Sequence, residues 1–149
     1  AVIFSKILAN ASAVYTSNKV KGAPLIVTKN HLKNGKAQAI VVNSGIANVC
    51  TGIKGIKDAE EMTKLVGNEL GINSNNVVVA STGLIGAYLP MNKIKNGVIG
   101  IKSKLNVKSN VAKAILKEQV ENLVKQQAEM EVLIETKGTK AKGLFGIFG

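Results

Sequence analysis

The chain has 149 residues, 46% of them hydrophobic and 19% charged, which suits one globular domain with a real core and excludes a disordered chain. The net charge of +11 comes from 20 basic residues that are all Lys. Because Arg is absent and aromatic residues make up 3%, specific nucleic-acid recognition is not expected. No apolar run approaches the roughly 20 residues of a membrane span, and no signal peptide is visible at the start.

The cysteine content and the first residue set two further expectations. Cys50 is the single cysteine, so an internal disulfide is excluded and we expect a reducing, cytoplasmic setting. With one His and one Cys, the sequence predicts no metal site. The chain begins with Ala1 instead of Met, from which we expect a processed or truncated product.

Short β-branched apolar runs alternate with helical patterns and predict a mixed α/β domain. The predicted strands are residues 2–4, 13–16, 25–28, 37–43, 77–81 and 130–136. Two of them, 37–43 and 77–81, are almost continuously apolar. This character predicts central strands that are covered on both faces.

Three helices are predicted between and after these strands. The clearest spans residues 59–70, with Asp58 as its N-cap and Gly71 as its left-handed end. Its apolar stripe consists of Met62, Leu65, Val66 and Leu70. A second helix starts after Pro90, and a third covers residues 110–128. The apolar side of the second helix is formed by Ile94, Val98 and Ile101.

Two polar loops follow the apolar strands directly and are the candidate places for chemistry. Residues 43–52 read NSGIANVCTG, and these small and amide side chains favour tight turns. Residues 81–86 read STGLIG. Because ligands bind at strand ends in α/β proteins, Thr82 and Gly83 can point a hydroxyl and a backbone N–H at one developing oxyanion. A plain structural turn is the alternative, and the residues alone favour it.

Two reactive side chains outside the Thr-Gly pair carry weaker signals. His31 lies in a polar stretch between lysines, which predicts a solvated surface histidine instead of a catalytic base. Cys50 follows a buried strand, and we expect it to be a small packed residue instead of a nucleophile.

Several blocks of the sequence, in order, resemble the ornithine acetyltransferase family, the bifunctional glutamate N-acetyltransferases of arginine biosynthesis. They are residues 15–24 (YTSNKVKGAP), 41–52 (VVNSGIANVCTG), 58–62 (DAEEM), 80–86 (ASTGLIG) and 89–91 (LPM). Ile46 stands where the family usually has Asn. The resemblance is specific over residues 1–101 and fades after about residue 112.

The resemblance implies a layered αββα sandwich and a precursor that cuts itself into an α and a β chain. The first Thr of the β chain is the family's nucleophile, which takes acetyl from N-acetylornithine and passes it to glutamate. No cofactor is implied, and acetyl-CoA is a candidate second acetyl donor. Thr82 and Gly83 fall on the family's oxyanion hole, and Lys142 on its substrate-binding Lys.

The sequence departs from the family in its last third. Residues 117–119 read KEQ where the family has Thr-Thr-Asp, and the segment with the cleavage site and nucleophilic Thr does not occur in the 149 residues. We therefore expect residues 1–149 to form a single, incomplete α-chain-like domain, inactive alone and paired with a β chain in an αβ hetero-oligomer.

Two alternatives from other classes stay open at this point. One is a non-catalytic relative that is kept as a binding or scaffold domain, which the KEQ replacement favours. The other is nonspecific binding of anions or nucleic acid through the lysines, which predicts a steep dependence of binding on salt. An intact Thr82-Gly83 pair favours the enzyme.

Overall fold

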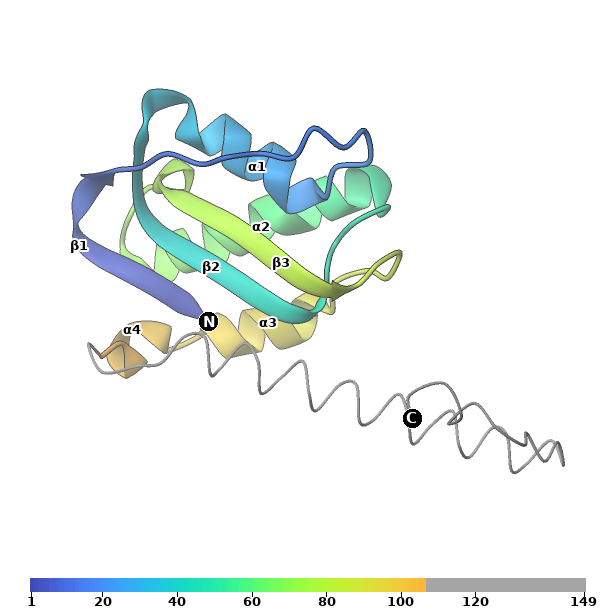
Figure 1. Ribbon diagram of the computed structural model, residues 1–149. Helices are drawn as coiled ribbons and strands as arrows, with labels where there is room; N and C mark the ends of the chain where they lie inside the picture. The colour runs from blue at the N-terminus through green and yellow to red at the C-terminus, as the bar shows by residue number, and fades with distance from the viewer. Residues whose placement is uncertain (107–149) are drawn as a thin grey trace, which may run out of the picture.

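The computed structural model describes residues 1–106, which form a mixed α/β unit around one three-stranded sheet (Figure 1). The sheet order is β1 (Val2–Asn10), β2 (Lys36–Ile46) and β3 (Val77–Leu84). β1 is antiparallel to β2, and β3 is parallel to it. The predicted mixed α/β class is confirmed, with one sheet layer and its helices among the described residues.

The helices pack against one face of this sheet, and Figure 1 shows α2 running behind the strands. They are α1 (Ala23–His31), α2 (Gly52–Leu70), α3 (Met91–Val98) and the short α4 (Ile101–Lys104), with 3-10 turns η1 (Leu32–Asn34) and η2 (Ser74–Asn76). The core between these layers is formed by Val27, Ala39, Val41, Ala59, Met62, Val66, Leu70, Val77, Val79, Leu89 and Val98. Burying these side chains is the main stabilising contribution to the unit.

The two apolar strands are covered less completely than their sequences predict. In β2, Ala39 and Val41 are 2% and 3% exposed, whereas Ile40 between them is 37% exposed. Successive side chains of a strand point to opposite faces, so one face is buried by the helices and the other is more open in the described unit. The expectation for β2 as the central strand is confirmed, but β3 lies last in the described sheet order, not in its centre.

Helix α1 covers the outer edge of β3. The Thr28 hydroxyl donates to the Val79 carbonyl oxygen at 2.8 Å and accepts from the Val79 N–H at 3.1 Å. The His31 ring nitrogen Nδ1 donates to the Val77 carbonyl oxygen at 2.7 Å. Two side chains thereby satisfy backbone groups that a neighbouring strand would otherwise pair.

This arrangement corrects two predictions. Residues 25–28 are helical, not a strand, and His31 is half-buried and hydrogen-bonded, not a solvated surface residue. Pro24 in the first turn of α1 suits a helix start. The β-branched residues of this stretch suggested a strand, but packing against β3 overrides that weak preference.

Replacing Thr28 by Val should destabilise the chain markedly, because Val has nearly the same shape but cannot hydrogen-bond. The Val79 N–H and carbonyl oxygen would both lose their partner in a buried place, at about 1–3 kcal/mol for each unpaired group. Urea unfolding of the 149-residue chain measures the loss. The exposed Thr16→Val is the matched control, and equal unfolding midpoints for the two variants would contradict the edge-capping role.

The start of α2 is also different from its prediction. The helix begins at Gly52, and its N-cap residue Thr51 makes no side-chain cap hydrogen bond. Asp58 lies inside the helix, where it is buried and accepts from Lys54 Nζ at 2.7 Å. The capping role of Asp58 is therefore wrong, because Gly52 and Gly55 made the first turns of the helix look like a loop.

Some of the remaining predictions are confirmed, one is wrong, and two concern residues that the structure does not describe. The apolar stripe of α2 packs inward, Gly71 ends it with φ +74°, and the helix after Pro90 is present as α3. Residues 13–16 form neither strand nor helix. The predicted helix over 110–128 and strand over 130–136 lie outside the described residues.

Candidate functional site

The ends of β2 and β3 lie side by side and bring the two candidate segments together. The strands run three residues beyond their predicted ends, to Ile46 and Leu84. In the parallel register, Ser44 is the partner of Thr82 and Gly45 the partner of Gly83. The Thr-Gly pair therefore lies near the end of β3, where pairing with β2 holds its backbone in place.

Gly83 makes the closest backbone approach of this site. Its φ is +128°, and a Cβ added to it would overlap the carbonyl carbon and oxygen of Gly45. Only Gly fits between the two strand ends, since the obstructing atoms are backbone. Thr82 is half-buried and Gly83 is exposed, so both can be reached by a small molecule.

Two backbone hydrogen bonds hold the chain just after the Thr-Gly pair. The Ala47 N–H donates to the Leu84 carbonyl oxygen at 2.9 Å, and the Gly86 N–H donates to the Val49 carbonyl oxygen at 2.9 Å. The loop after β2 is thus hydrogen-bonded to the turn after β3 at Leu84 and Gly86, the two neighbours of Ile85. The two sequence loops that were singled out separately form one structural unit.

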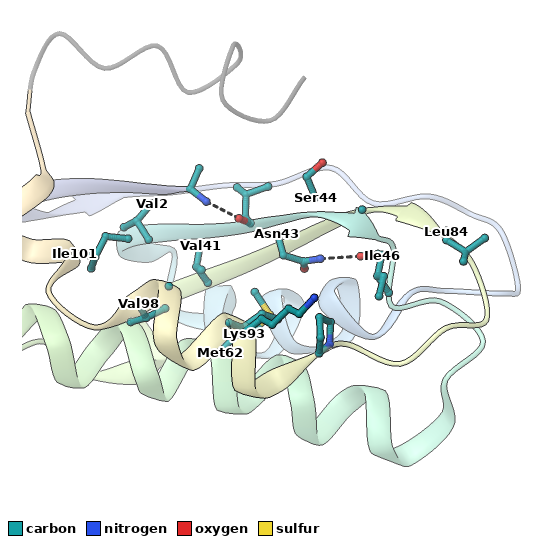
Figure 2. Close-up of a pocket in the computed structure, with 16 residues that line it drawn as sticks. Val2, Val41, Asn43, Ser44, Ile46, Met62, Leu84, Lys93, Val98 and Ile101 are labelled. Carbon is teal, nitrogen blue, oxygen red and sulfur yellow. Dashed lines mark hydrogen bonds between the residues drawn. The ribbon is translucent and has the colours of Figure 1, made fainter. Parts of the chain in front are cut away.

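A cavity of about 490 Å³ lies beside these strand ends, between the sheet and α3 (Figure 2). Asn43 projects into the space between the sheet and α3, and its Nδ2 donates to the Ile46 carbonyl oxygen at 2.8 Å. Its Oδ1 is buried and has no hydrogen-bond partner among the described residues. Lys93 of α3 adds a positive charge to the lining. Thr82 and Gly83 do not line this cavity, which lies on the helical side of the sheet.

Of the other candidate residues, Cys50 lies in the loop after β2. Cys50 is exposed with φ +59°, so its prediction as a packed residue is wrong. Lys142 and residues 117–119 lie outside the described residues. Within residues 1–106, no three metal-ligating side chains come together and no helix is long and apolar enough to cross a membrane.

The family of the chain follows from its match to known sequences. The ArgJ family model matches residues 1–144. The chain belongs to the ArgJ family. This result confirms the resemblance to ornithine acetyltransferases, as the names of the similar proteins show.

Curated ArgJ proteins are similar to this chain over about two thirds of its length. The arginine biosynthesis bifunctional protein ArgJ of Caldanaerobacter subterraneus subsp. tengcongensis is 55% identical over 98 residues, which are 66% of this chain and 24% of that protein. The protein of the same name from Staphylococcus aureus is 56% identical over 102 residues, 67% of this chain and 25% of that protein. The chain therefore spans about a quarter of the length of these ArgJ relatives.

Two solved structures share the fold. The Bacillus halodurans ArgJ structure has a TM-score of 0.65 at 46% identity, over 66% of this chain and 52% of that chain. The Mycobacterium tuberculosis ornithine acetyltransferase, solved in complex with ornithine, has a TM-score of 0.62 at 38% identity, over 65% and 53%. These matches confirm the fold class of the ArgJ-like unit.

Proposed function

We propose that the chain is the α-chain-like part of an ornithine acetyltransferase that moves acetyl from N-acetylornithine to glutamate. The acetyl group passes through a threonine of a β chain outside the 149 residues. The observation that carries the proposal is the Thr82-Gly83 pair, which ends a paired strand with its backbone tightly held. A family relative solved with ornithine supports the substrate class.

The Thr82-Gly83 pair supplies electrostatic stabilisation to the transfer. When the β-chain threonine oxygen attacks the acetyl carbonyl carbon, the C=O electron pair moves to the oxygen and makes an oxyanion. The Thr82 hydroxyl and the Gly83 N–H donate to that oxygen. When the C=O bond forms again, the bond to the ornithine nitrogen breaks, and this nitrogen leaves as an amine with the proton that the threonine hydroxyl gave up, so that acetyl-threonine remains. The glutamate amine then attacks the acetyl-threonine and forms a second oxyanion at the same place, and as this collapses the threonine oxygen leaves and regains a proton while the glutamate nitrogen loses one. The paired strands keep the donors oriented before the charge develops.

The surface beside the pair suits a protein partner. Leu84, Ile85 and Tyr88 follow Gly83 closely and are 51%, 61% and 57% exposed. Apolar side chains gathered beside a site favour a protein contact. We assign this surface to the β chain, in an αβ hetero-oligomer that works in the cytoplasm. We propose that the transfer uses no cofactor, with acetyl-CoA as a candidate second acetyl donor.

A non-catalytic scaffold is the second candidate, because residues 117–119 read KEQ where the family has Thr-Thr-Asp. This replacement removes the threonine that the resemblance implies for substrate binding. It leaves the Thr82-Gly83 pair intact. The two candidates therefore differ in whether acetyl reaches a threonine.

Reconstitution with a β chain separates the two candidates. The 149-residue chain alone should transfer no acetyl from N-acetylornithine to glutamate, because the attacking threonine is absent. The same chain co-expressed with an ArgJ β chain should restore transfer and give a threonine that is heavier by one acetyl group in the mass spectrum. A folded assembly with neither product favours the scaffold.

A further inference from the structure

We propose that Asn48 is a positioning residue for the Thr82-Gly83 pair. The inference rests on the proposed function and names a residue whose hydrogen bonds go to Ala23, Thr51 and Gly55. Its buried side chain fixes the loop after β2, and this loop holds the backbone that follows Gly83.

Asn48 is the most firmly anchored polar residue of that loop. It is 0% exposed. Its Nδ2 donates to the Gly55 carbonyl oxygen at 2.9 Å, and its Oδ1 accepts from the Thr51 hydroxyl at 2.7 Å. Its backbone oxygen accepts from the Ala23 N–H at 3.0 Å. These contacts tie one residue to the starts of both α1 and α2.

The packing around the amide leaves no spare room. A Cβ on Gly55 would overlap both the Thr51 hydroxyl oxygen and Asn48 Oδ1. The missing side chain at Gly55 therefore lets the first turn of α2 close over the Asn48 amide. This close approach explains a glycine within the helix, where it otherwise lowers stability.

The anchoring reaches the oxyanion pair through the neighbours of Asn48. Ala47 and Val49, on either side, make the two backbone hydrogen bonds to Leu84 and Gly86. Leu84 is covalently next to Gly83. A loosened Asn48 therefore loosens the turn on which the Gly83 backbone depends. Because oxyanion donors must lie within about 0.5 Å of their productive positions, small shifts there reduce the rate.

Asn combines a backbone preference and a hydrogen-bonding capacity that no other residue type would bring to position 48. Its φ of +53° is adopted readily by Asn, Asp and Gly and poorly by most other residues. The amide can both donate to the Gly55 oxygen and accept from Thr51. Gly keeps the backbone and loses both bonds. Asp would place a carboxylate oxygen, which cannot donate, against the Gly55 carbonyl oxygen.

The decisive variant is Asn48→Gly in the complete enzyme, meaning this chain with its β chain. The control is Cys50→Gly, which lies in the same loop with φ +59° but is exposed and has no place in the Asn48 network. Asn48→Gly should lower kcat by about 10–100-fold with KM within a few-fold, as expected for misplaced donors. Cys50→Gly should leave both near the original values.

A second readout does not depend on activity. Amide hydrogen exchange, followed by mass spectrometry on peptides containing Ala47 and Gly86, should be faster in Asn48→Gly and unchanged in Cys50→Gly. If the unaltered assembly transfers no acetyl, the proposed function fails and this exchange alone decides the positioning role. Unchanged exchange, or faster exchange with an unchanged kcat in an active assembly, overturns the proposal.

A milder variant keeps the test valid if Asn48→Gly does not fold. Thr51→Val retains the shape of the side chain and removes the hydroxyl that donates to Asn48 Oδ1. It should lower kcat and speed exchange in the same direction by a smaller factor. Thr51→Ser should restore both, since Ser keeps the hydroxyl. Equal values for Val and Ser also contradict the inference.

Discussion

Thr82→Ala should lower kcat by about 10²–10³-fold in the complete enzyme while KM stays within a few-fold. The hydroxyl acts on charge that develops in the transition state, and the ground-state carbonyl is held less tightly. Thr82 lies in a strand paired with β2, so its backbone should stay in place when the hydroxyl is removed. Steady-state kinetics with N-acetylornithine and glutamate measures the effect.

Thr82→Ser is the matched variant, since it retains the hydroxyl and loses a methyl group. It should keep much more activity than Thr82→Ala. A well-folded Thr82→Ala enzyme with its original kcat would remove the oxyanion role from this residue. A fall in stability and in substrate affinity together, at constant kcat, would assign Thr82 to shaping the strand end.

Gly83→Ala should abolish transfer and destabilise the unit. The added methyl group overlaps the backbone of Gly45, and no side-chain rotation can relieve it. Overpacking and a φ of +128° each cost on the order of 1–3 kcal/mol for a non-glycine residue. Thermal unfolding and acetyl transfer, measured on the same preparation, should both show the loss.

Gly86→Ala is the control for backbone conformation without crowding. Gly86 has φ +84°, but a Cβ there meets nothing within 4 Å. The left-handed conformation alone costs about 1–2 kcal/mol, so Gly86→Ala should be milder in stability and activity. Equal effects at both positions would show that crowding against Gly45 is unimportant.

Local patterns in the sequence predicted the elements whose character does not depend on distant partners. The apolar stripe of Met62, Val66 and Leu70 repeats with the helical period, so it specified the inward face of α2. Residues 37–43 and 77–81 were recognised as strands because β-branched runs favour the pleated conformation. The motif order of the family identified Thr82 and Gly83 as the candidate pair.

Long-range contacts decided what these patterns left open. Thr28 belongs to a helix because its hydroxyl pairs with Val79, 51 residues away in the chain. Asp58 is not a cap because α2 starts six residues earlier, at Gly52. The glycines there were interpreted as a loop because their low helix propensity is a local property. Gly55 is required by the close approach of α2 to Asn48, whereas Gly52 adopts a φ of +59° with no neighbour within 4 Å.

The sequence by itself therefore determined the family, the α/β class, the main apolar faces and the identity of the Thr-Gly pair. Only the tertiary structure decided that Gly45 and Gly83 meet backbone to backbone, and that Asn48 supports the turn beside them. Hydrophobic periodicity and motif spacing are carried by neighbouring residues, so they can be read along the chain. A hydrogen-bond partner across the sheet depends on how the elements pack, which no local pattern encodes.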